Sequence, residues 1–137
     1  MSERPATKGQ IVNFTYELNC KAHEAWDNGY LDTAVRMFRQ LARMGEVDAM
    51  VNLGTMLDDR ITPPDPQGAI YWYMRAFRAG DEAGAWNLAM HYIPRGNLRW
   101  YRFWMAKAEE MGEEDAIVEM AKIRADPNYM TKLPLED

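Results

Sequence analysis

The sequence predicts an all-α protein, an α-α superhelix of stacked helical hairpins. The first observation is that glycines following a helical pattern recur at Gly45, Gly80 and Gly112, with spacings of 35 and 32 residues. The second is that apolar or small residues precede each glycine at offsets of 3, 4, 7, 8 and 11, which lie on one face of an α-helix. The third is that acidic residues and a second small or apolar pattern follow each glycine. A repeat of this length is typical of stacked helix pairs.

Small and large side chains alternate at the repeated offsets, so that neighbouring helices can approach closely and fill the space between them. The positions are Ala34, Met37, Phe38, Leu41 and Ala42 before the first glycine, Ala69, Trp72, Tyr73, Ala76 and Phe77 before the second, and Tyr101, Trp104, Met105, Ala108 and Glu109 before the third. Only Glu109 departs from the pattern. These residues are therefore the predicted core.

The first hairpin is expected over residues 10–45, after a flexible arm of residues 1–9. Its first helix begins near Gln10 and is closed by Gly29, because glycine readily takes the left-handed conformation that ends a helix. The expected apolar stripe of that helix consists of Ile11, Phe14, Leu18, Ala22, Ala25 and Trp26. Asp32 is a candidate cap for the second helix.

The second and third hairpins are expected over residues 46–80 and 81–112. Three prolines between Ile61 and Pro66 require a loop, with Asp65 as the cap and Pro66 as the first residue of the next helix. A break at residues 94–97 divides the third hairpin. Residues 113–137 are expected to form a capping helix and a tail, with Tyr129, Met130, Leu133 and Leu135 folding back over the end of the stack. We therefore expect a single domain over residues 10–137.

The central unit resembles the Sel1-like repeat, a relative of the tetratricopeptide repeat. The family's Ala-x2-Trp-Tyr-x-Lys-Ala-Ala-x2-Gly motif matches at Ala69, Trp72, Tyr73, Ala76 and Gly80, with Arg75 in the lysine position and Phe77 in the second alanine position. Its Leu-Gly-x2-Tyr element corresponds to Leu53-Gly54-Thr-Met-Leu57 and Leu88-Ala89-Met-His-Tyr92. The resemblance spans roughly residues 20–125. It implies stacked hairpins that bind other proteins, and no catalytic residues.

Composition narrows the choice of partners. The net charge of −5 disfavours nucleic acid and anionic membranes but suits a protein with a basic patch. The N-terminal region lacks the apolar core of a secretion signal, and no apolar run is long enough for a membrane span, so a cytoplasmic location is expected. A single cysteine excludes an internal disulfide.

Three groups of residues were considered for other chemistry. Cys20 and His23 share a helix face, but too few further ligands are present for a metal site, and a buried thiol beside a solvent-facing histidine is the preferred reading. The cluster of Arg95, Arg99, Trp100, Tyr101 and Arg102 offers a weak footprint for nucleic acid, because Tyr101 falls on a core offset. Asp58-Asp59 has no basic partner placed by the sequence and reads as a solvated helix end.

The resemblance implies that the first helix of each hairpin lines the concave face. The candidate partner-binding residues there are Asn52, Met56, Asp59, Trp86, Asn87, Met90, His91 and Glu119. Part of the Trp86 ring is expected to be exposed. We expect a non-enzymatic protein-binding module without cofactors, monomeric or weakly dimeric. We expect it to act as a small stand-alone inhibitor, such as a bacterial immunity protein that neutralises a cognate toxin by 1:1 binding, or alternatively as an adaptor or assembly scaffold.

Overall fold

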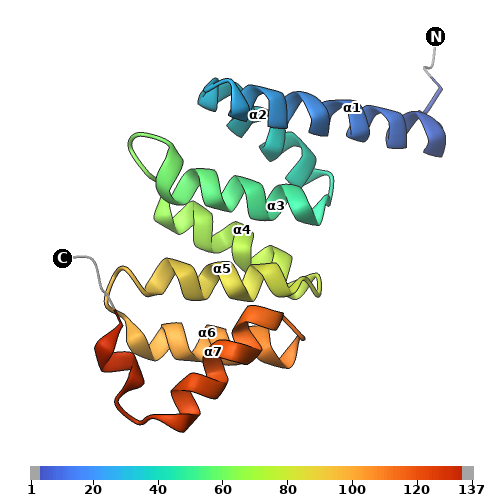
Figure 1. The fold of residues 1–137 in the computed structure, drawn as a ribbon. Coiled ribbons are helices and arrows are strands. Elements are labelled where there is room, and N and C mark those ends of the chain that lie inside the picture. Colours follow the sequence, from blue (N-terminus) through green and yellow to red (C-terminus); the bar gives the residue numbers. More distant parts are fainter. Residues whose placement is uncertain (1–3, 134–137) are drawn as a thin grey trace.

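The computed structural model describes residues 4–133, and these are all-α, as predicted (Figure 1). The α-helices are α1 (Lys8–Asp27), α2 (Leu31–Arg43), α3 (Val47–Thr55), α4 (Pro66–Arg78), α5 (Glu82–Tyr92), α6 (Leu98–Glu110) and α7 (Glu114–Ala125). Two short elements complete the fold, the π-helical η1 (Met56–Arg60) and the 3₁₀-helical η2 (Tyr129–Lys132). Leu135, predicted to belong to the covering tail, lies outside the described residues.

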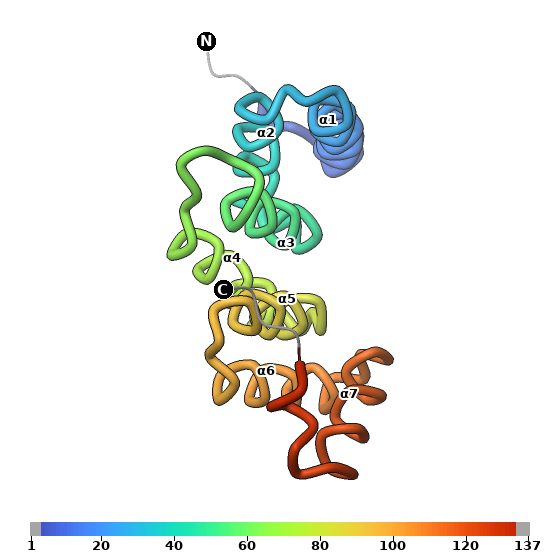
Figure 2. Tube along the Cα trace, turned by 60° about the vertical axis from the view of Figure 1, so that its left-hand side comes forward, coloured from blue at the N-terminus to red at the C-terminus, as the bar shows by residue number. Residues whose placement is uncertain are grey.

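The helices form two layers. Each helix packs chiefly against the next one along the chain, and α3 also contacts α5. Figure 2 shows the odd-numbered helices along one side of the molecule and the even-numbered helices along the other. The core lies between the layers. The predicted positions of α2, α4 and α6 supply about half of its buried apolar residues, and α1, α3, η1, α5 and α7 supply the rest. Every residue at the repeated offsets is buried except Met37, Phe77 and Glu109, which are half-buried.

Five helix ends use the same closing turn. The backbone N–H of each glycine donates to the carbonyl three residues back, and the next N–H donates to the carbonyl five residues back. Each glycine has a positive φ, between 72° and 94°, which other residues adopt at a cost. The glycines are Gly29, Gly45, Gly80, Gly96 and Gly112. Each turn that joins two consecutive α-helices, apart from the one before α4, is therefore made in the same way.

Helix starts agree with the sequence at some positions and differ at others. Asp65 caps α4 by accepting the Gly68 N–H at 3.0 Å, as predicted. However, α1 begins at Lys8 rather than near Gln10, because Thr7 and Gln10 form a reciprocal capping box. Asp32 is not a cap; α2 begins directly after Tyr30, and Asp32 lies in its first turn.

The departure at Glu109 has a structural explanation. Its carboxylate accepts two hydrogen bonds from the Arg124 guanidinium, at 2.6 Å and 2.8 Å. This bidentate pair joins α6 to α7 and lowers the pKa of Glu109, chiefly through the hydrogen bonds from Arg124. A charged residue at a core offset is thus tolerated at the edge of the stack.

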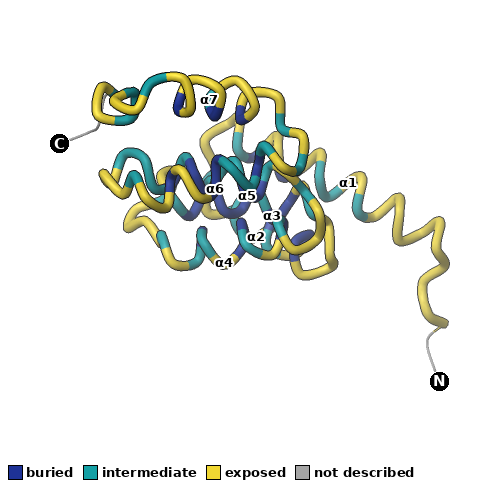
Figure 3. The backbone as a smooth tube through the Cα atoms, turned by 90° about the horizontal axis from the view of Figure 1, so that it is seen from below, coloured by how far each residue is buried: buried dark blue, intermediate teal, exposed yellow. Residues whose placement is uncertain are grey.

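The two ends of the stack leave apolar surface uncovered. The N-terminal half of α1 extends beyond the other helices (Figure 3), and the predicted stripe residues Ile11 and Phe14 are exposed rather than packed. Their neighbour α2 is too short to reach them. At the other end, Tyr129, Met130 and Leu133 pack against the core, as predicted for the tail. Ile117 and Val118 of α7 nevertheless remain exposed.

Candidate protein-binding surface

Two rows of side chains form the candidate site, one along α3 and η1 and the other along α5 and the turn that follows it. Residues 48, 52, 55 and 59 follow one helix face, and residues 83, 87, 90 and 94 repeat that face 35 positions later. We call this the inner surface. It consists of Asp48, Val51, Asn52, Thr55, Asp59, Ala83, Trp86, Asn87, Met90 and Pro94, all half-buried or exposed.

A hollow lies at each end of the inner surface. One, of about 260 Å³, is lined by residues from α1, α3 and α5: Asn19, His23, Asp48, Val51, Asn52, Asp81 and Ala83. The other, of about 400 Å³, is lined by Asp58, Asp59, Met90, Pro94 and Arg95. Trp86 and Asn87 occupy the α5 turn between these ends.

Five of the eight residues predicted to bind a partner are accessible on this surface: Asn52, Asp59, Trp86, Asn87 and Met90. Partial exposure of Trp86 is confirmed. The Asn87 side chain donates to its own helix, to the Ala83 carbonyl at 2.8 Å, which leaves its amide oxygen available. Within residues 4–133, the Asn52 side chain makes no hydrogen bond. These amides can therefore bond to an incoming group.

Met56 and His91 are buried, so they cannot contribute side chains to an exposed site. They follow Gly45 and Gly80 by the same number of residues and therefore occupy equivalent positions. Each lies three residues after a core leucine, Leu53 or Leu88, and i, i+3 neighbours share a helix face. The structure thus contradicts their predicted accessibility, because this position of the helix faces the core.

Glu119 is the third of the predicted partner-binding residues whose surroundings differ from the prediction. It occupies the α7 position equivalent to Asn52 and Asn87, but it is half-buried and one of its carboxylate oxygens, Oε1, is fully buried. Tyr101 and Tyr129 lie near this carboxylate. Burial is the chief cause of the raised pKa of Tyr101, and Glu119 adds to it, whereas for Tyr129 the interaction with Glu119 is itself the chief cause. The chain turns back after α7 and places Tyr129 here. Glu119 thus belongs to the covered end of the stack.

A polar cluster at the second hollow, built around the buried His91, was missed by sequence reasoning. His91 Nδ1 lies 2.9 Å and 3.0 Å from the carboxylate oxygens of Asp58, so its N–H donates to them. The Arg95 guanidinium donates to the same carboxylate at 3.1 Å. Asp58 is therefore not a solvated helix end, and its partners come from 33 and 37 residues further along the chain. The available signal was a histidine at a core position, since a buried imidazole requires a hydrogen-bond partner.

The buried phenol of Tyr73 makes the stability of the protein depend on pH in the alkaline range. Burial raises its pKa to about 12; a hydrogen bond with Thr55 opposes this rise, and the carboxylates of Asp58 and Asp59 add to it. The unfolded tyrosine loses its proton near pH 10 whereas the folded one keeps it. Stability is therefore expected to fall between about pH 10 and pH 12, by on the order of 2 kcal/mol from this residue.

Urea unfolding at a series of alkaline pH values measures this loss. Tyr73→Phe is expected to flatten the decline, while Tyr71→Phe, at an exposed position on the same helix, leaves it unchanged. An equal decline in Tyr73→Phe and the unaltered protein would contradict the assignment. Burial also raises the pKa of Tyr101, so part of the decline in stability should remain in both variants.

Charge differs between α3 and α5 on one layer and α4 on the other. Neither α3 nor α5 contains lysine or arginine, and each carries an acidic residue in its first turn, Asp48 and Glu82. By contrast, α4 contains Arg75 and Arg78 and no acidic residue. The surface formed by α3 and α5 therefore presents carboxylates and amides, with positive charge at its η1 end, where Arg60 pairs with Asp59 and Arg95 pairs with Asp58.

The basic-aromatic cluster predicted from the sequence is kept only in part: Arg99, Trp100 and Arg102 line one hollow, whereas Arg95 pairs with Asp58. Tyr101 is buried, as predicted, whereas Trp100 is exposed on α6. Cys20 is exposed, not buried as expected. Within residues 4–133, no three histidine, cysteine or acidic side chains meet in a group that could hold a metal ion.

Comparison with known proteins yields no match among family models, curated proteins or solved structures. Across the described part of the chain, none of the helices has both the length and the apolar character required to traverse a membrane. Functional inference therefore depends on the geometry and chemistry of the surfaces themselves.

Proposed function

We propose that the chain is a protein-binding module that holds one partner on the inner surface. The observation that carries this proposal is the pair of matching rows on α3 and α5, with a hollow at each end. Half-exposed Trp86 and Met90 supply apolar area, and Asn52 and Asn87 supply amides. Binding sites between proteins combine such aromatic anchors with polar groups at their edges.

The partner is expected to be basic. Asp48 and Asp59 lie at opposite ends of the α3–η1 row, and α3 and α5 contribute no lysine or arginine. A cationic partner would gain chiefly from Asp48, which makes no ion pair within residues 4–133, since Asp59 already pairs with Arg60 at 3.2 Å. Complementary charge raises association rates and selects partners. Within this class we favour a small inhibitor, such as an immunity protein that neutralises a toxin by 1:1 binding.

The proposal also includes the repeat architecture of the fold. We place the fold among right-handed α-α superhelices of Sel1-like repeats. Support comes from the recurring glycine turns and from equivalent burial at positions 35 residues apart, such as Met56 and His91. In repeat stacks of this kind, one layer forms a continuous surface suited to binding.

An adaptor is the second candidate, because α6 carries a separate exposed patch on the opposite layer. Trp100 and Phe103 are each 42% exposed, and their rings meet edge to face at 5.3 Å. Arg99 and Arg102 line the same hollow of about 400 Å³. An adaptor would use this patch for a second partner while the inner surface holds the first.

Affinity capture from the source cells, followed by titration of the purified partner, tests the proposal. The inhibitor proposal expects one basic protein at 1:1 stoichiometry. Trp86→Ala is expected to weaken binding by at least tenfold, about 1.4 kcal/mol or more, as for an interface anchor. Affinity should also fall as salt concentration rises.

Trp100→Ala is the matched control, since it removes an exposed tryptophan from the other layer. Equal binding by the control and the unaltered protein, with loss in Trp86→Ala, supports the inner surface. Loss of a second partner in the control alone supports the adaptor. Unchanged binding in Trp86→Ala would overturn the proposed site.

A further inference from the structure

The outer face of α6 combines exposed aromatic rings with exposed arginines. Arg102 and Phe103 lie three and four residues after Arg99, so the three side chains share one helix face. Together with Trp100 they line a hollow of about 400 Å³. Within the described part of the chain, neither arginine takes part in an ion pair. Arg99 also lies in the first turn of α6, where the helix dipole favours acidic residues, so helix stability does not explain an arginine there.

Positive charge is concentrated on the even-numbered helices, which lie along one side of the molecule (Figure 2). Together α2, α4 and α6 contain eight lysine or arginine residues and three acidic residues, in a chain that has 16 and 21. Two of these three acidic residues are already paired, Glu109 with Arg124 and Glu110 with Lys107. This layer therefore attracts anions although the chain as a whole is negatively charged.

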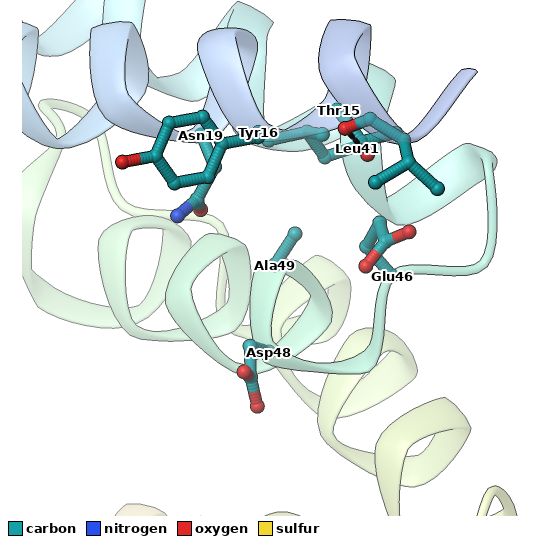
Figure 4. Close-up of a pocket in the computed structure, with 8 residues that line it drawn as sticks. Thr15, Tyr16, Asn19, Leu41, Glu46, Asp48 and Ala49 are labelled. Atoms are coloured by element: carbon teal, nitrogen blue, oxygen red, sulfur yellow. Dashed lines mark hydrogen bonds between the residues drawn. The ribbon is translucent and has the colours of Figure 1, made fainter. Parts of the chain in front are cut away.

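The hollows on the other layer carry the opposite charge. The one between α1 and the start of α3 (Figure 4) is lined by Glu46 and Asp48 and by no lysine or arginine. The one at the α1 end of the inner surface is lined by Asp48 and Asp81 and likewise by no lysine or arginine. Electrostatic attraction therefore directs an acidic ligand to α6 and away from these two hollows.

The same aromatic–cation pair occurs on α4 and α6. Tyr71 and Phe103 each lie nine residues before the glycine that closes their helix, and they are 52% and 42% exposed. Arg75 lies over the Tyr71 ring, 5.8 Å from its centre. Lys107 lies over the Phe103 ring, 5.6 Å from its centre. The two helices thus present equivalent binding chemistry, an aromatic edge beside a cation.

These rings are better placed to contact aliphatic side chains at their edges than to stack on nucleic-acid bases. Tyr71 and Phe103 each have one face covered by a cation, and Trp100 packs on Tyr92 with ring centres 6.3 Å apart. Platforms for single-stranded nucleic acid use free ring faces. The net charge of −5 also opposes a ligand that carries a charge on every unit. A peptide in which apolar residues separate the carboxylates fits both observations.

We propose that the outer faces of α4 and α6 bind an acidic peptide segment of a partner protein. An apolar side chain of the segment enters the hollow beside Trp100 and Phe103, and neighbouring carboxylates pair with Arg99 and Arg102. A further carboxylate reaches Arg78 on α4. Both helices pack on α5, so their axes lie up to about 20 Å apart, which roughly six extended residues span. The segment belongs to the second partner that the adaptor candidate requires, and the proposal rests on that candidate.

Titration of isotope-labelled protein with a synthetic peptide, followed by NMR, tests the proposal. The probe is a peptide of about eight residues composed of glutamate and leucine, long enough to span both helices. The indole N–H signal of Trp100 is expected to shift progressively, whereas that of Trp86, on the other layer, stays in place. Arg99→Glu combined with Arg102→Glu is expected to raise the dissociation constant by at least about tenfold.

Lys8→Glu combined with Lys21→Glu is the matched control. It changes the net charge by the same amount at two exposed lysines of α1, and it should leave the affinity within about twofold. A peptide with glutamine in place of glutamate is expected not to bind. Circular dichroism verifies that both double variants remain folded.

Four results would each overturn the proposal. These are no shift of the Trp100 signal at millimolar peptide, equal weakening in the two double variants, equal binding of the glutamine peptide, and tighter binding of an oligouridylate of the same length, which would indicate nucleic acid. None of them bears on capture of the basic partner, which Trp86→Ala tests. The inner surface and the outer face can therefore fail independently.

Discussion

Gly84→Ala is expected to destabilise the protein by about 2–3 kcal/mol, because α4 and α5 meet at this glycine without room for a side chain. A methyl group at Gly84 would lie 2.5 Å from the Phe77 nitrogen and 2.6 Å from the Tyr73 carbonyl oxygen. Both are backbone atoms, so the two helices must separate to admit it. This cost exceeds the gain of about 1 kcal/mol that alanine offers over glycine within a helix.

Gly9→Ala provides the control for this substitution. Gly9 also lies in a helix, but nothing is within 4 Å of the added methyl group. Only the helix-propensity gain applies there, so stability should be unchanged or slightly higher. Thermal and urea unfolding measure both variants. Equal stability of Gly84→Ala and the unaltered protein would show that α4 and α5 do not approach as closely as described.

The second large effect is expected at Asp58. Asp58→Ala should cost about 2–4 kcal/mol, because it leaves the buried His91 N–H without an acceptor and removes the carboxylate that Arg95 contacts. The side chains of His91 and Asp58 are only 3% and 13% exposed, so water offers little replacement. The loss should also loosen η1 from α5.

Asp59→Ala is the control, because it removes one carboxylate without removing the partner of His91. Asp59 is the adjacent residue with the same side chain, but it is 68% exposed and pairs only with exposed Arg60. Its removal is expected to change stability by less than about 1 kcal/mol. Urea unfolding of both variants, with hydrogen exchange at η1, measures the contrast. Similar losses for the two aspartates would contradict a specific role for the Asp58–His91 pair.

Much of the fold was predictable because its signals are local. A glycine that ends a helix and apolar residues three and four positions apart both act within one or two turns of chain. The same reasoning identified Asp65 as a cap, and it identified Trp86 as partly exposed from its position in the repeat. The repeat also located the accessible rows of α3 and α5.

The remaining features depend on residues that are distant in sequence. The apolar pattern of α1 continues to Ile11 and Phe14, and nothing in that pattern reveals that α2 is too short to cover them. Glu119 is covered only because the chain reverses after α7 and brings Tyr129 onto it. The π-helical turn of η1 and the Asp58–His91 pair likewise arise where two hairpins meet, which one-dimensional periodicity does not describe.

The turn before α4 differs from the others in a way that bears on engineering. There the chain leaves η1 and reaches Asp65 through exposed or half-buried residues and prolines, without a glycine closure. Residues added between Thr62 and Pro64 would lengthen an exposed connection without altering a core position, and lengthening a loop costs little entropy. This segment is therefore the natural place to insert a reporter domain, or to divide the gene into two fragments that reassemble across the α3–α4 interface.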